Sequence, residues 1–99
     1  MLHIVNKSPA QTHSLTSCLR LARDGQALLL TEDAVYAATA AAAQASGLSA
    51  AATRLKIYAL QPDVDARGMA GKLMAGVTLV DYAGFVELVA EYPNNQTWL

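Results

Sequence analysis

Sulfur chemistry is the first chemistry that the sequence raises, because Cys18 is the only cysteine of the chain. A sulfur carrier needs an accessible thiolate, and thiolates are favoured at helix N-termini or beside positive groups. Cys18 instead shares an apolar stripe with Leu15, Leu19 and Ala22 at helical spacing. Free cysteine is among the most buried residue types. The spacing therefore favours a buried core thiol, and a persulfide carrier is the alternative.

Charged residues follow two short apolar runs that read as strands. Glu32 and Asp33 come after the first of these runs, and Asp63 and Arg67 come after the second. Ligands of open α/β sheets bind beyond the carboxyl ends of the strands. We therefore expect these four residues to be candidate partner contacts. The structural alternative is that Asp33 caps a helix and that Asp63 and Arg67 complement the charge of another one.

Trp98 is a candidate anchor for a partner, since a large aromatic residue so late in the chain either packs back on the sheet or anchors a subunit contact. The two histidines, His3 and His13, have no cysteine or matching spacing beside them, so no metal site is predicted. The sequence also lacks G-x-G-x-x-G, P-loop and G-x-S-x-G motifs. No cofactor is predicted.

Alternating strand and helix patterns must position these residues. Apolar runs predict strands over residues 2–6, 26–31, 55–60 and 77–80, with a short fifth strand at 97–99. Short strands joined by helical crossovers give a parallel sheet with helices on both faces. We therefore expect residues 1–99 to form a single α/β domain of three layers, with a mostly parallel sheet of four to five strands.

Helical patterns fill the segments between these strands. They run from Ser8 or from 12–14 to about residue 23, and over 34–45, 62–67 and 82–92. Asp33 and Asp81 are predicted to cap the second and fourth helices, because a carboxylate accepts the free amide hydrogens at a helix start. Residues 48–53 have no clear pattern and are expected to form a surface loop.

The composition indicates a chain with a partner. Hydrophobic residues make up 54% and charged residues 15%, whereas globular chains carry about 25% charged residues. Part of the surface is therefore expected to be covered by another subunit. The net charge of −1 provides no basic field for binding nucleic acid directly.

The number of cysteines and the hydropathy of the chain indicate the cellular compartment in which the protein is expected. A lone cysteine excludes an internal disulfide framework and suits a reducing compartment. The N-terminal residues lack the basic and long apolar segments of a secretory signal. The longest weakly polar stretch, residues 34–45, is too short to span a bilayer. We expect a cytoplasmic protein without membrane contact.

The sequence resembles the TusB/DsrH family over nearly its whole length. The resemblance depends on the order and spacing of several short pieces, none of which is specific alone. They are Leu2-His3, Lys7-Ser8-Pro9, Ser17-Cys18-Leu19-Arg20, Glu32-Asp33-Ala34-Val35-Tyr36-Ala37, Tyr58-Ala59-Leu60, Ala66-Arg67-Gly68, Asp81-Tyr82, Phe85-Val86-Glu87-Leu88 and Trp98-Leu99.

This resemblance implies a role in a sulfur relay. It implies TusC/DsrF-like and TusD/DsrE-like sister subunits in a heterohexamer that passes persulfide sulfur to a TusE/DsrC-like acceptor. The sulfur is destined for 2-thiolation of the tRNA wobble uridine, with tRNA contacted only indirectly. The main acceptor cysteine belongs to the TusD/DsrE-like sister, so this chain is expected to be an accessory subunit and not the catalytic one.

Three alternatives remain open at this point. The family also includes DsrH-like subunits of dissimilatory sulfur oxidation, which share the same architecture. B/H subunits often carry a cysteine at the position of Cys18, which permits direct persulfide transport by this chain. A stand-alone homo-oligomeric binding module is the third alternative.

Overall fold

Four short strands form where the sequence has its apolar runs, a fifth forms in a mostly polar segment near residue 98, and the computed structural model describes residues 1–98. The strands pair in the order β4-β3-β2-β1-β5, and all four pairings are parallel. Their bounds are β1 (Leu2–Val5), β2 (Ala27–Leu30), β3 (Lys56–Leu60), β4 (Val77–Val80) and β5 (Asn95–Trp98). The predicted α/β class is confirmed, and the predicted strand at 97–99 begins earlier; Leu99 lies outside the described residues.

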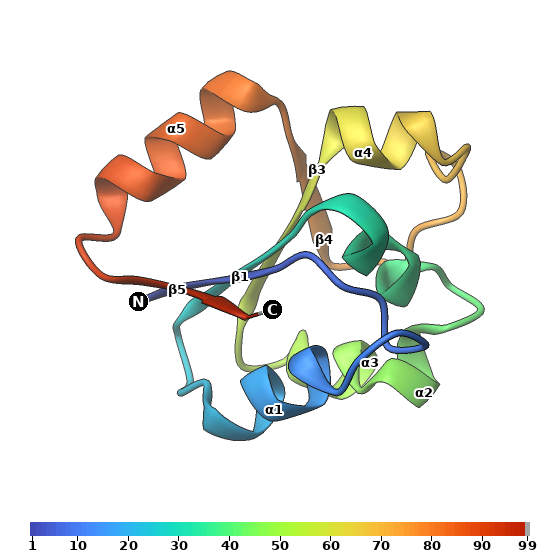
Figure 1. The fold of residues 1–99 in the computed structure, drawn as a ribbon, viewed down its shortest axis with the longest axis horizontal. Coiled ribbons are helices and arrows are strands. Elements are labelled where there is room, and N and C mark those ends of the chain that lie inside the picture. The colour runs from blue at the N-terminus through green and yellow to red at the C-terminus, as the bar shows by residue number, and fades with distance from the viewer. Residues whose placement is uncertain (99) are drawn as a thin grey trace.

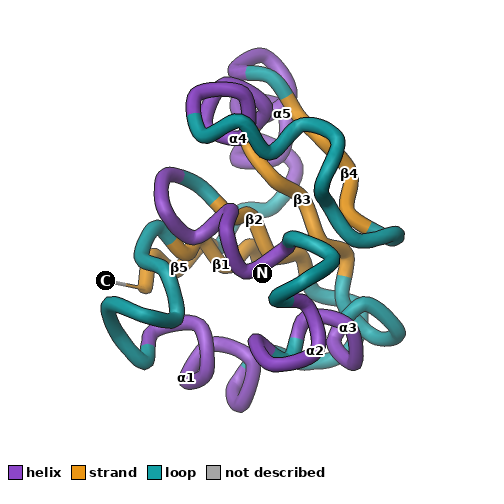
Figure 2. Tube along the Cα trace, turned by 90° about the vertical axis from the view of Figure 1, so that its right-hand side faces the viewer, coloured by secondary structure: helices purple, strands orange, loops and turns teal. Residues whose placement is uncertain are grey.

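Helices lie on both sides of this sheet (Figure 1). They are α1 (Ser14–Leu21), the 3-10 helix η1 (Glu32–Ala38), α2 (Ala43–Ser46), α3 (Leu48–Ala51), α4 (Gln61–Ala66) and α5 (Tyr82–Glu91). In Figure 2, α1, α2 and α3 lie below the sheet, and α4 and α5 lie above it. The expected three-layer arrangement is therefore present.

The central strand β2 explains why the sheet needs cover on both faces. All four of its residues are fully buried, as expected for a strand in the middle of a parallel sheet. Its side chains alternate between two apolar clusters. Leu28 and Leu30 join the larger cluster with residues of α1, η1, α3 and α4, and Ala27 and Leu29 join the smaller one, to which α5 contributes.

The first helix begins at the later of its two predicted starts. The Ser8 amide donates to the Gln11 side-chain oxygen at 3.0 Å, and the Gln11 amide donates to the Ser8 carbonyl. These bonds close one turn, and the chain does not continue it as a helix. The Thr12 hydroxyl oxygen then accepts the Ser14 amide at 3.2 Å, where α1 starts.

The helix predicted over residues 34–45 is wrong in its start, its length and its cap. Residues Glu32–Ala38 form η1, and the chain leaves helical geometry at Thr39, where φ is −66° and ψ is 150°. The Thr39 hydroxyl donates to the Tyr36 carbonyl and accepts the Ala42 amide. This side chain thus offers the backbone local bonds that compete with a continuous helix. The high helix propensity of the alanine residues did not outweigh these local bonds.

The surface loop predicted at 48–53 is also wrong. Gly47, with a φ of 87°, ends α2 and directly precedes α3. A Cβ atom at Gly47 would lie 3.2 Å from the Leu19 side chain, so α1 packs closely on this turn. Leu48 is 0% exposed and belongs to the larger apolar cluster. One buried leucine among small residues was too weak a pattern to predict this helix.

The last helix, α5, forms where it was predicted, but apolar residues on its outer side remain exposed. Asp81 caps α5 as predicted, because its carboxylate accepts the Gly84 amide at 2.8 Å. Leu88 is buried against the sheet. On the outer side, Tyr82 is 62% and Val86 is 68% exposed. Helix α5 therefore presents an apolar outer face. Within residues 1–98, no helix has the length and hydropathy needed to cross a membrane.

Candidate functional site

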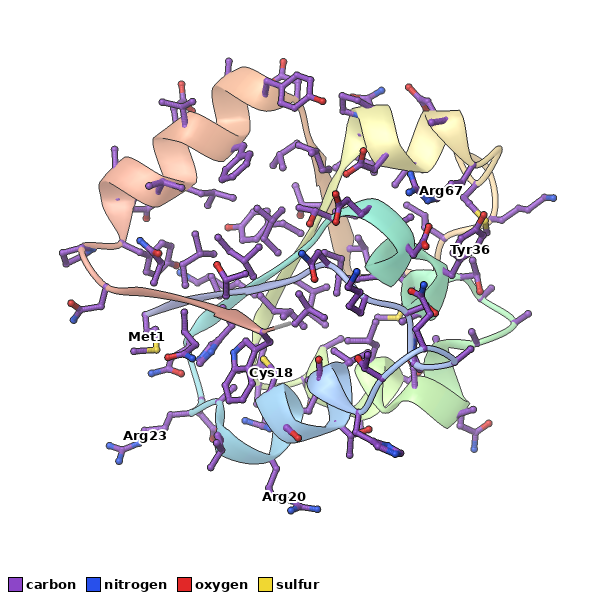
Figure 3. All side chains as sticks on the ribbon, in the orientation of Figure 1. Met1, Cys18, Arg20, Arg23, Tyr36 and Arg67 are labelled. Carbon is purple, nitrogen blue, oxygen red and sulfur yellow. The ribbon has the colours of Figure 1, made fainter. Side chains whose placement is uncertain are left out.

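Cys18 lies in the core, between α1 and the sheet (Figure 3). Its side chain is fully buried, at 0% exposure. Burial raises the pKa of the Cys18 thiol to about 12, and the nearby Arg54 guanidinium opposes part of that rise. Because the thiolate is the nucleophile in sulfur transfer, a protonated and enclosed thiol is poorly suited to accept sulfur in this conformation.

Arg54 holds the C-terminal end of α1 beside this thiol. Its guanidinium donates to the Leu19 carbonyl at 2.6 Å and to the Ala22 carbonyl at 2.7 Å, and it lies 3.5 Å from the Asp24 carboxylate. Cations at helix C-termini satisfy free carbonyls and complement the helix dipole. Arg54 could not be predicted from the sequence, because the groups that it bonds lie 30 to 35 residues earlier and its own segment has no clear pattern.

Replacing Arg54 with alanine is expected to lower the free energy of unfolding by about 2 kcal/mol, because two charge-assisted hydrogen bonds are lost. Urea denaturation followed by circular dichroism measures the change. Arg20→Ala is the matched control, since Arg20 is exposed on α1, the helix whose end Arg54 binds. The effect of this control should stay within about 0.5 kcal/mol. Equal effects of the two changes would show that the carbonyl contacts contribute nothing.

The four charged residues predicted as partner contacts lie at the carboxyl end of the sheet. The Arg67 Nε–H donates to the Asp33 carboxylate at 2.9 Å, and its Nη1 donates to the Asp63 carbonyl at 3.2 Å. The Asp63 carboxylate accepts the Glu32 backbone amide at 2.7 Å. The predicted capping role of Asp33 is therefore wrong, because its carboxylate faces Arg67 and Thr31 stands at the N-cap position without a side-chain bond.

These contacts join η1 to α4 and leave a shallow cavity beside them. The cavity has a volume of about 310 Å³, and Glu32 and Asp63 line it together with Asn6 and Thr31. Glu32 has a φ of 49°, a left-handed conformation that is uncommon for a residue with a side chain. The Asn6 Oδ1 atom is buried without a hydrogen-bond partner among the described residues. The rest of the described lining consists of Ile4, Leu60, Tyr82 and Phe85, so the cavity combines polar groups with apolar ones and contains no thiol.

Trp98 packs back on the sheet, against His3 of β1. The Trp98 indole N–H donates to His3 Nδ1 at 3.2 Å, and the ring centroids are 6.1 Å apart. His3 is 3% exposed. Since the indole nitrogen only donates, Nδ1 accepts and Nε2 carries the hydrogen, which is directed to the Gln26 side-chain oxygen at 2.7 Å.

The arrangement can therefore hold elements together and present surfaces, but it does not expose a nucleophile of the kind that sulfur transfer needs. Among residues 1–98, no group of three or more histidine, cysteine or acidic side chains could hold a metal ion. Cys18 lies in the core, the charged cluster lies at the carboxyl end of the sheet, and Trp98 lies with His3 on the strand pair β1 and β5.

Comparisons with known proteins found relatives that match nearly the whole chain. The family model described as DsrH like protein matches residues 7–95. The protein TusB of Pectobacterium parmentieri is 40% identical over 98 residues, which is 99% of this chain and 100% of that protein. The protein TusB of Escherichia coli K12 is 37% identical over the same length. The crystal structure of the ychN protein from E. coli has a TM-score of 0.79 at 22% identity, covers 98% of this chain and 97% of its own, and supports the fold alone.

Proposed function

Since the chain belongs to the TusB/DsrH family, a family of sulfur-relay subunits, we propose that it is an accessory subunit of the persulfide relay for 2-thiolation of the tRNA wobble uridine. It assembles with TusC/DsrF-like and TusD/DsrE-like sister subunits in a heterohexamer in the cytoplasm. The assembly delivers sulfur to a TusE/DsrC-like acceptor, and tRNA meets this chain only indirectly.

The burial of Cys18 is the observation that supports the accessory role. It is the only thiol of the chain, it is 0% exposed, and its pKa is raised to about 12. A carrier cysteine must instead reach its donor and acceptor as a thiolate. The sulfur is therefore carried by a cysteine of a sister subunit, and this chain supports that subunit structurally.

The apolar outer face of α5 supports assembly with sister subunits. Tyr82 and Val86 are more than half exposed, and Val89 is 38% exposed on the same helix. Obligate interfaces are rich in such side chains. Together with the low content of charged residues, 15%, this face is consistent with a chain that works inside a complex.

Intact-mass analysis tests the proposal. The chain is co-expressed with its sister subunits, the complex is purified, and a cysteine desulfurase supplies persulfide. We expect a mass gain of one sulfur atom on a sister subunit, with this chain unmodified. Iodoacetamide at neutral pH should likewise leave Cys18 unmodified in the folded complex and alkylate it in guanidinium chloride.

Cys18→Ser is the matched variant for this experiment. The accessory role predicts that sulfur loading of the sister subunit is unchanged by it. Sulfur found on this chain and lost in Cys18→Ser would instead make the chain a carrier. Failure to associate with the sister subunits would favour a stand-alone module.

A further inference from the structure

Strand β5 leaves one edge of the sheet open. It pairs with β1 on one side and is the last strand in the sheet order, so its other side has no strand partner among the described residues. Gln96 and Thr97 in its middle are exposed. The strand has no charged residue or proline, which are devices that discourage pairing with another chain. Its outer backbone groups are therefore available to an added strand.

A cavity of about 500 Å³ lies beside this edge. Met1, Leu21 and Trp98 give it apolar walls, and Gln26 and Gln96 add amide groups. Leu21 is 64% and Met1 is 42% exposed. These side chains offer a place for a bulky apolar side chain next to an open strand edge. Strand-addition sites combine backbone bonds with such side-chain pockets.

Hydrogen bonds hold the aromatic wall of the cavity in place. Trp98 donates to His3, and His3 donates to the Gln26 side-chain oxygen. The same oxygen accepts the Arg23 backbone amide at 3.0 Å. This chain of bonds joins the end of β5 to the segment after α1. A site that is fixed before binding loses less entropy when a ligand arrives.

The cavity has a cationic side chain, that of Arg23, which bears on the kind of ligand it suits. Arg23 is the only Lys, Arg, Asp or Glu among its described lining residues. No acidic side chain pairs with the Arg23 guanidinium in the part of the chain that the structure describes, while neighbouring Asp24 lies against Arg54. Met1 and Arg23 lie on the same side of the molecule in Figure 3, and Arg20 points elsewhere. A carboxylate on the incoming segment would match Arg23.

We propose that β5 and this cavity bind an extended acidic segment of a partner protein by strand addition. A bulky apolar side chain of the segment packs against Trp98 and Leu21, and a carboxylate pairs with Arg23. RNA is the less suitable occupant, because single-strand grooves need several cations along the backbone and Arg23 is the one cationic side chain among the described residues that line this cavity. The proposal goes beyond the sulfur relay and does not depend on it.

Peptide selection on the full-length chain tests this site. Random ten-residue peptides without tryptophan are displayed on phage, and enriched sequences are synthesised. We expect them to combine acidic residues with a bulky apolar residue. Trp98 is the only tryptophan of the chain, so its emission reports on the cavity directly and should shift on binding. The amides of β5 should exchange more slowly in the complex.

Two charge reversals separate the site from a general charge effect. Arg23→Glu should weaken binding at least about tenfold, and Arg20→Glu, an equal charge change at an exposed position of α1, should weaken it less than about twofold. Circular dichroism confirms that both variants fold. The proposal is overturned by no enrichment over an unrelated protein, by equal effects of the two variants, or by binding that leaves Trp98 emission unchanged. Trp98 quenching by a single-stranded RNA decamer with no peptide binding would also overturn it.

Discussion

Replacing Leu48 with alanine is expected to lower the free energy of unfolding by about 3 kcal/mol and the melting temperature by roughly 10 to 20 °C. Leu48 is fully buried in the larger apolar cluster and anchors α3 beneath the sheet. Alanine would remove apolar surface from this cluster and leave a cavity that the surrounding helices fill only in part. Urea denaturation followed by Trp98 emission and circular dichroism measures the loss.

Leu21→Ala is the control for this change. It deletes the same atoms at a position that is 64% exposed, so its cost should stay within about 0.5 kcal/mol. A cost for Leu48→Ala of less than about 1 kcal/mol would mean that residues 48–51 do not pack as a buried helix. In that case the interpretation of this segment as a surface loop would be restored.

Alkaline pH is expected to destabilise the protein through Cys18. Its thiol pKa rises from an ordinary value of 9.0 to about 12 in the folded chain, mainly through burial. The unfolded chain therefore loses this proton at a lower pH than the folded chain does. The stability that the protonated thiol contributes is complete below pH 9 and is lost between pH 9 and 12. The loss should be on the order of 1 kcal/mol at pH 10 and should be larger at pH 11.

Cys18→Ala isolates this contribution from other titrating groups. Tyrosine and lysine side chains also titrate in this range, but they are the same in both proteins and cancel in the difference. The variant should be less stable at pH 7 by about 1 kcal/mol because of lost packing. The order should reverse near pH 10, since the variant has no thiol to ionise. Parallel stability curves from pH 7 to 11 would contradict a buried, protonated thiol.

The first four strands and the last helix could be predicted because their sequence signals are local. Ala27–Leu30 is a continuous apolar run of strand length, and such a run needs cover on both faces. Asp81 stands directly before an amphipathic pattern, and its carboxylate reaches an amide only three residues later. In both cases the signal lies within a few neighbouring residues of the sequence, although β2 itself pairs with the distant strands β1 and β3.

The interactions that escaped prediction join residues distant in sequence. Asp33 bonds Arg67, 34 residues later, and not the start of its own helix. Arg54 reaches back 35 residues to the Leu19 carbonyl. Periodicity does not report such pairings, because they exist only once the sheet has brought the segments together.

The alanine-rich segment failed for a local reason. It was predicted as one helix from propensity, yet a single threonine, bonded to residues three positions away, and a glycine divide it.

The position of β5 has a consequence for synthesis of the protein. The sheet order places this strand against β1, so Val5 pairs with Trp98, which comes 93 residues later in the sequence. During translation β1 can pair with β2 early, but its second side stays unpaired until residues 95–98 have been synthesised and have left the ribosome. An emerging chain with an exposed strand edge is prone to aggregation. Slow translation of the segment that leads to β5 would prolong that exposure, and chaperones that act on nascent chains would be most useful in this interval.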